Sequence, residues 1–235
     1  MTKSYVLHYA PDNASLIVRL VLDELGQPYR TRLVDRRRGA QRDEAYLQLN
    51  PNGLIPTLET PHGAIFETGA ILLWLADRHK AMAPGPKDPE RGEFLKWLFF
   101  ISNTLHADLR ISFYPAQYAG SGPATLAALR KKVQERIARH LGLLDDVAAS
   151  GVGWFGGEAP SVLDYYVMCC ARWTALYPIE GPHAEARLED FPSLLSMAQR
   201  LEARPATARA IEAEGLGPRP FTRPKLPNPP EGSPM

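Results

Sequence analysis

Residues 50–79 read NPNGLIPTLETPHGAIFETGAILLWLADRH and decide the fold of the first part of the chain. Asn, Pro and Gly residues at 50–53 and 60–63 favour turn dihedrals, so each cluster predicts a turn. The segments 55–59 and 64–67 beside the second turn predict two short strands. Thr68 stands where a helix N-cap is needed, just before an apolar series formed by Ile71, Leu72, Trp74 and Leu75.

Two features of this stretch indicate more than local structure. Ile55 precedes Pro56, and a cis peptide is accessible before proline; we expect it to turn the backbone of Ile55 outward. Glu67 and Thr68 open the predicted helix, where a hydroxyl and free N–H groups attract an anion and a carboxylate can pair with an ammonium. Together they suit an amino acid head group, although a simple cap and a strand-end charge explain the same two residues.

The order N-P-x-G-x-I-P-x-L, followed by F-E-T-G-A-I-L-x-W-L-A, resembles the glutathione-binding half of the cytosolic glutathione transferases. In that family the residue before the cis-proline offers its backbone to the cysteinyl part of glutathione, and the acid–hydroxyl pair holds the γ-glutamyl head. The family most often has serine where this chain has Thr68, which keeps the hydroxyl. The resemblance implies that glutathione is bound by Asn52, Leu54, Ile55, Pro56, Glu67 and Thr68.

Composition excludes several other classes of protein. The chain has 235 residues with a net charge of +1, which gives no argument for nucleic-acid or membrane-surface binding. The two cysteines, Cys169 and Cys170, are adjacent and offer neither a disulfide framework nor metal-ligand spacing, so we expect no metal and a reducing, cytoplasmic location. We find no signal peptide and no apolar stretch long enough to span a bilayer.

The remaining pattern predicts two domains and a tail. Strands at 4–9 and 29–34 flank a helix at 14–25, and a short helix is expected near 43–49. With the stretch at 50–79, this order is βαβαββα, a thioredoxin-like domain over residues 1–80. A linker at 81–88 leads to an all-α domain over 89–217, with helices around 94–109, 126–144, 161–173, 191–204 and 205–212.

Two further features belong to the second half of the chain. Ser161 and Asp164 form an S-x-x-D capping box, a folding motif that the glutathione transferases also carry at the matching place. The tail at 218–235 is rich in proline, so it can form neither a helix nor a paired strand, and it is either loose or laid on the surface.

The turn after the first strand is where thioredoxin-like folds place a group that stabilises a thiolate, and here it includes Asp12, Asn13 and Ser15. Ser15 is the first candidate for this catalytic role and Asn13 the second, although either is equally suited to cap the helix. Asp12 would repel a thiolate, so it is assigned no contact with sulfur. The turn resembles that of bacterial beta-type enzymes, whose cysteine is replaced by Ala14. The turn also resembles that of bacterial nu-type enzymes, which carry a threonine and an asparagine there. These two residues fall on Asp12 and Ala14, so neither is kept in this chain.

The helical domain must supply an apolar wall for a second substrate. The candidates lie on or just after its first long helix: His106, Arg110, Phe113, Tyr114 and Tyr118. A lone histidine on a helix is more often structural, and Phe113 and Tyr114 are more often core than pocket. The basic loop at 36–42 is expected to be solvated, with one arginine at the glycine carboxylate of glutathione as the alternative.

The resemblance therefore implies a glutathione S-transferase, a homodimer in that family, which uses glutathione as co-substrate for detoxification. The thiolate would attack an electrophilic carbon or a disulfide. The alternatives are a binding or regulatory protein that kept the fold without turnover, and a glutathione-dependent disulfide reductase or lyase.

Overall fold

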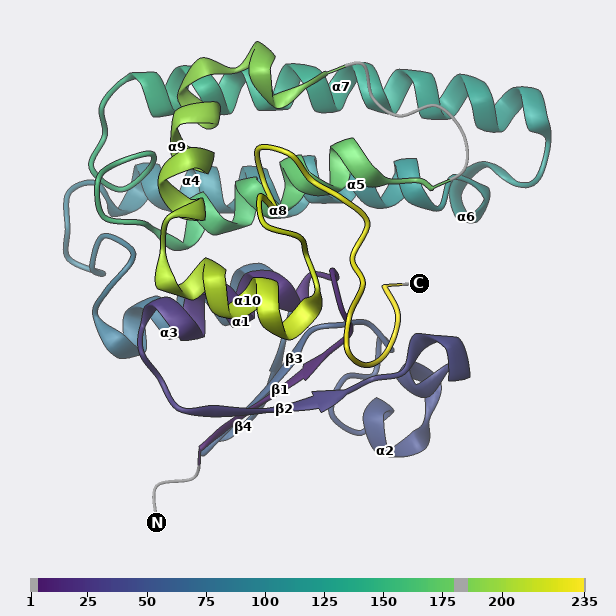
Figure 1. Cartoon of the computed structure of the whole chain (residues 1–235), viewed down its shortest axis with the longest axis horizontal. Helices are drawn as coiled ribbons and strands as arrows, with labels where there is room; N and C mark the ends of the chain where they lie inside the picture. The colour runs from purple at the N-terminus through teal and green to yellow at the C-terminus, as the bar shows by residue number, and fades with distance from the viewer. Residues whose placement is uncertain (1–3, 180–185, 235) are drawn as a thin grey trace.

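The computed structural model describes residues 4–179 and 186–234 of the chain. A small sheet with its helices forms one layer, and a bundle of longer helices lies above it (Figure 1). Among the described residues, no helix is both long and apolar enough to cross a bilayer.

The sheet has four strands in the order β2-β1-β3-β4. β1 (Tyr5–Tyr9) runs parallel to β2 (Tyr29–Leu33) and antiparallel to β3 (Thr57–Thr60), and β3 pairs with β4 (Gly63–Phe66). The helices are α1 (Ser15–Glu24), α2 (Glu44–Leu47) and α3 (Thr68–His79). Helices α1 and α3 lie between the sheet and the helical bundle (Figure 1). The predicted order βαβαββα is confirmed.

Two boundaries in the decisive stretch differ from the sequence prediction. The peptide between Ile55 and Pro56 is cis, as expected, but β3 begins only at Thr57. Proline has no N–H to give to the ladder, so the strand starts after it. Helix α3 begins at Thr68 itself, and Glu67 occupies the N-cap position with φ of 70°.

The helical part begins with α4 (Arg91–Phe100) and α5 (His106–Phe113), which a π-helical turn (Ile101–Leu105) joins. Residues 94–109 were predicted as one helix, and the π turn was missed because it leaves the apolar spacing nearly unchanged. Helix α5 ends before Pro115, a residue that cannot continue the helical hydrogen bonds. The others are α6 (Ala116–Ala119), α7 (Pro123–Ala149), α8 (Val162–Leu176), α9 (Pro192–Glu202) and α10 (Pro205–Glu214).

Helix α8 is the central element of the bundle, and nearly all its residues are buried. The predicted capping box is present: the Ser161 hydroxyl accepts from the N–H of Asp164 at 3.4 Å, and the Asp164 carboxylate accepts from the N–H of Ser161 at 2.8 Å. The same carboxylate accepts from the N–H of Gly156 at 2.9 Å. Burial raises the pKa of Asp164 to about 6, although these hydrogen bonds favour its ionised form.

The tail contains no helix or strand between residues 218 and 234, as predicted, and it runs back along the bundle toward the sheet (Figure 1, yellow). Phe221 is buried in the core, and Glu202 on α9 accepts hydrogen bonds from the N–H groups of Phe221 and Thr222. Farther along, the N–H of Asn228 donates to Gly215 at 2.9 Å, and Ser233 is buried. The tail is therefore laid on the protein.

Candidate functional site

Three loops meet at one end of the sheet. His8 near the end of β1 is paired with Thr57 at the start of β3, and Thr57 is paired with Phe66 at the end of β4. The turn after β1, the cis-proline loop and the start of α3 therefore lie side by side. This end of the sheet is the candidate functional site.

The cis-proline loop is held from behind and open in front. Asn50 Nδ2 and the Tyr46 hydroxyl donate to the carbonyl of Leu54, at 2.8 and 2.6 Å. Asn52 is exposed, and its N–H donates to Asn50 Oδ1 at 3.1 Å. Ile55, which follows Leu54, is only half-buried. No other described residue hydrogen-bonds to its backbone N–H or C=O. A half-buried unpaired peptide group is suited to an extended ligand backbone.

The start of α3 is likewise unoccupied by the protein itself. Glu67 is exposed and its side chain makes no capping hydrogen bond. The Thr68 side chain is buried, and its hydroxyl bonds to no other described residue. The first N–H groups of a helix lack partners and carry the positive end of its dipole. This corner therefore offers a carboxylate, a hydroxyl and an anion-binding helix end together.

The turn after β1 separates the two predicted thiol-activating residues. Ser15 is fully buried, and its hydroxyl donates to the carbonyl of Ala10 at 3.0 Å and accepts from the N–H of Ala10 at 3.3 Å. Asn13 is only half-buried, and its Nδ2 donates to the carbonyls of Pro11 and Pro234, at 2.9 and 3.1 Å. Ser15 closes the turn from inside, while Asn13 faces the interface with the tail.

Arg36 was assigned to a solvated loop, and the structure places it at the site. Its guanidinium donates to Asn13 Oδ1 at 3.1 Å, to the carbonyl of Pro234 at 2.6 Å and to the Tyr114 hydroxyl at 2.9 Å. No described carboxylate pairs with it. The arginine joins the first turn, the tail and the end of α5.

The residues proposed for the second substrate divide into two groups. Tyr114 reaches the first turn through Arg36, and Phe113 packs edge-on against Tyr177 at 5.8 Å between ring centroids. Arg110 belongs to the same group: its guanidinium lies over the Tyr114 ring, 6.0 Å from the centroid, and its Nε donates to the Tyr118 hydroxyl at 3.2 Å.

His106, at the start of α5, faces residues of α8. Its Nδ1 is 2.9 Å from the Tyr166 hydroxyl, and its ring is 5.5 Å from that of Trp173. Burial, assisted by the nearby Arg110 charge, lowers the pKa of His106 to about 4. The imidazole is therefore neutral at physiological pH.

Sequence reasoning missed two groups at this end of the sheet: the network around Asp12 and the tail. From the sequence, the only expectation for the Asp12 carboxylate was that it would repel a thiolate. In the structure this carboxylate is buried and accepts hydrogen bonds from Arg172 and Tyr177. One signal was available, since an arginine within the apolar helix 162–176 predicts a buried acidic partner. Nothing in the sequence indicated that Glu231 and Pro234 would reach Tyr9 and Asn13.

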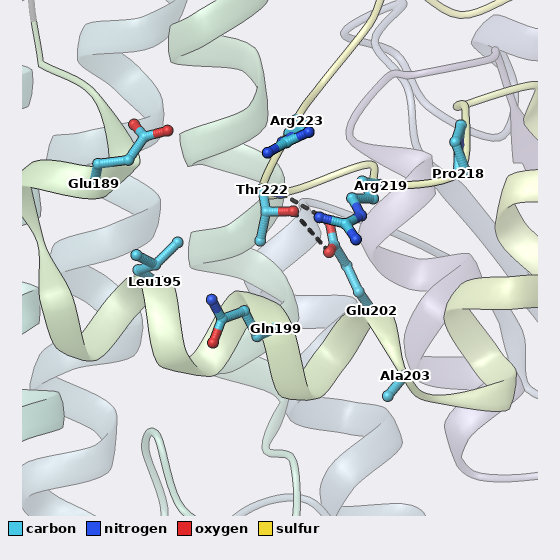
Figure 2. Close-up of a pocket in the computed structure, with 9 residues that line it drawn as sticks. All are labelled: Glu189, Leu195, Gln199, Glu202, Ala203, Pro218, Arg219, Thr222 and Arg223. Carbon is cyan, nitrogen blue, oxygen red and sulfur yellow. Dashed lines mark hydrogen bonds between the residues drawn. The ribbon is translucent and has the colours of Figure 1, made fainter.

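Figure 2 shows a separate open groove of about 600 Å³ on the far part of the bundle. Its walls come from α9, the turn before it and the start of the tail, and the Glu202 carboxylate within it accepts from the Thr222 hydroxyl. The groove lies away from the three loops and includes none of their residues. Across residues 4–179 and 186–234, no group of three or more His, Cys, Asp or Glu side chains could hold a metal ion.

Both parts of the chain match models of known protein families. The family model for the glutathione S-transferase N-terminal domain matches residues 14–78, and that for the C-terminal domain matches residues 107–213. Glutathione S-transferase 2 of Schizosaccharomyces pombe is 36% identical over 213 residues, which cover 83% of this chain and 89% of that protein. The chain belongs to the glutathione S-transferase family.

Bacterial members of the glutathione S-transferase family are also similar over most of the chain. The disulfide-bond oxidoreductase YfcG of Escherichia coli K12 is 27% identical over 218 residues, covering 90% of this chain and 96% of that protein. A sphingomonad glutathione S-transferase, solved in complex with glutathione, superimposes with a TM-score of 0.73 at 29% identity, covering 90% of this chain and all of that one (100%). The thioredoxin-like domain followed by a helical domain is therefore the fold of this family.

Proposed function

We propose that this protein binds glutathione along Ile55 and at the start of α3, and activates its thiol for attack on an electrophilic small molecule or a disulfide. The observation that carries the proposal is the unpaired backbone of Ile55 beside the free start of α3. The cysteinyl amide of glutathione would bond to the backbone of Ile55. The γ-glutamyl ammonium would pair with Glu67, and the γ-glutamyl carboxylate would bond to Thr68 and the start of α3. The sphingomonad relative, which was solved in complex with glutathione, supports glutathione as the ligand.

The thiol then lies at the turn after β1. The Ser15 hydroxyl is fully buried and bonds to Ala10, whereas Asn13 Nδ2 is part-buried and bonds to the tail carbonyl of Pro234. We therefore propose that Asn13 Nδ2 exchanges the Pro234 carbonyl for the thiolate and stabilises it. The backbone N–H of Ala14, which bonds to no other described residue, is the second donor. Both precede α1, whose dipole favours negative charge at this end. The Arg36 cation adds to that effect.

We place the second substrate between this turn and the end of α5. Phe113 and Tyr114 provide aromatic surface there, and Arg36 links Tyr114 to Asn13. His106 and Arg110 are proposed to border this space, with a neutral imidazole that acts as a hydrogen-bonding group. An apolar electrophile fits such a wall.

Two further candidate functions rest on specific observations. A glutathione-dependent disulfide reductase is favoured by the similarity to YfcG, which is named a disulfide-bond oxidoreductase. A binding protein without turnover is favoured by the engagement of Asn13 Nδ2 with Pro11 and Pro234. A homodimer and a cytoplasmic location complete the proposal, and the free, buried thiols of Cys169 and Cys170 are compatible with that location.

The test begins with calorimetric titration of the protein with glutathione. Rates are then measured with a panel of aromatic and alkyl electrophiles and with mixed disulfides, following conjugate and oxidised glutathione separately. Conjugate identifies a transferase, and oxidised glutathione from disulfides alone identifies a reductase. Binding without either product supports the non-catalytic alternative, and absence of binding refutes the proposal.

A further inference from the structure

Asp12 is the most constrained residue of the turn after β1. Its φ of 51° lies in the left-handed region, which side chains other than glycine rarely adopt. Its carboxylate is buried and accepts hydrogen bonds from Trp173 Nε1 and the Tyr177 hydroxyl, both at 2.9 Å. Arg172 Nε and one terminal nitrogen donate to its two oxygens, at 2.9 and 3.0 Å. The helical domain thus supplies four donors to one side chain of the other domain.

Arg172 is committed entirely to structure. Its side chain is fully buried. Nη1 donates to the carbonyl of Pro220 at 3.0 Å, and Nη2, which also holds Asp12, donates to the carbonyl of Lys225 at 2.9 Å. The arginine therefore ties the turn and the tail to α8 at a single point. Because these donors are engaged, Arg172 can affect a bound ligand only through Asp12 and the tail, which it holds in place.

A second anchor fixes the backbone of the same turn. The N–H of Asp12 donates to Glu214 on α10 at 2.7 Å, and Glu214 is itself paired with Arg19 on α1 at 2.7 Å. Both the side chain and the N–H of Asp12 are thus held by helices of the other domain. The next residue along the chain is Asn13, the proposed thiolate donor.

We propose that Asp12 and Arg172 are a positioning pair, through which the helical domain sets the direction of Asn13 and of the start of α1 toward the thiol of glutathione. This inference rests on the proposed function. Buried charge pairs persist in one geometry because either partner alone would be left uncompensated. The pair thus holds the turn in a backbone conformation that it would otherwise leave.

The test uses Tyr177→Phe, which removes one donor to Asp12 and leaves both charges in place. Tyr165→Phe is the matched control, because Tyr165 is buried on α8, the helix that ends just before Tyr177, and its hydroxyl donates to the Glu24 carboxylate of α1 at 2.7 Å. Asp12→Asn is the stronger variant, and its folding is checked by circular dichroism before use. Each protein is assayed for glutathione affinity, for kcat, and for the pH at which the bound thiol ionises, followed by thiolate absorbance.

We expect Tyr177→Phe to lower kcat by about threefold to tenfold and to move the ionisation of bound glutathione to higher pH, with its affinity unchanged. Tyr165→Phe should lose similar thermal stability while keeping the wild-type kcat and titration. Equal behaviour of the two variants would overturn the positioning role, as would a Tyr177→Phe protein that loses affinity but keeps its titration. Failure of the wild-type protein to bind glutathione would instead refute the proposed function.

Discussion

Replacing Glu67 by alanine tests the assignment of the amino acid head group most directly. The side chain is exposed and makes no capping hydrogen bond, so its removal should cost little stability. A hydrogen bond between ionised groups contributes about 1.5–3 kcal/mol, and exposure to solvent reduces this to about 1–2 kcal/mol. Because every 1.4 kcal/mol is about tenfold in affinity, Glu67→Ala should raise the Kd for glutathione by about fivefold to thirtyfold.

The assay is a double-mutant cycle in which the ligand supplies the second change. Wild-type protein and Glu67→Ala are each titrated calorimetrically with glutathione and with its analogue lacking the γ-glutamyl amino group. If Glu67 pairs with that ammonium, the analogue binds both proteins with nearly equal affinity, and the coupling free energy is about 1–2 kcal/mol. Glu67→Gln keeps an acceptor without the charge, so its Kd for glutathione should lie between those of the wild-type protein and Glu67→Ala.

Glu90→Ala is the matched control, because Glu90 is also an exposed glutamate at an N-cap without a side-chain capping bond, at the start of α4. It should bind both ligands as the wild-type protein does. A coupling free energy near zero for Glu67 would refute the reasoning, since the carboxylate would then contact no ammonium. An equal loss in Glu90→Ala would show that only the overall charge of the protein matters.

Three further predictions follow from other parts of the structure. Asp164→Ala leaves the N–H groups of Gly156 and Ser161 without their acceptor, and chemical denaturation should show a loss of about 2–4 kcal/mol; an unchanged midpoint would contradict the capping box. Deleting residues 231–235 releases Asn13 Nδ2 from Pro234, so steady-state assays should show a higher kcat with bulky electrophiles, and a lower value would mean that the tail forms part of the substrate wall. Burial lowers the pKa of His106 from 6.5 to about 4, so the unfolded state binds this proton more readily. As the pH is lowered from about 6.5 to 5, the wild-type protein should therefore lose about 1–2 kcal/mol of unfolding free energy relative to His106→Gln, and parallel pH profiles of the two proteins would contradict this.

Local pattern predicted much of the fold because it acts over a few residues. The capping box links residues three apart, and the turns around residues 50–53 and 60–63 fix the strands beside them. Patterns of this range do not report how a helix winds, so the π turn before His106 was missed. Such patterns also do not decide whether Glu67 or Thr68 is the N-cap of α3, because the choice depends on the backbone angles of Glu67.

The sequence by itself determined the order of the elements, the cis peptide before Pro56, and the acid and hydroxyl at the start of α3. Only the tertiary structure decided how the side chains of the first turn are oriented. Asp12 turns inward because Arg172, 160 residues away, neutralises it, and Asn13 meets a carbonyl that lies 221 residues away. Such contacts arise when the two domains pack, and no spacing within the turn encodes them. For this reason the sequence narrowed the proposed thiol-contacting side chain to a short segment, and the choice of Asn13 within that segment depends on the fold.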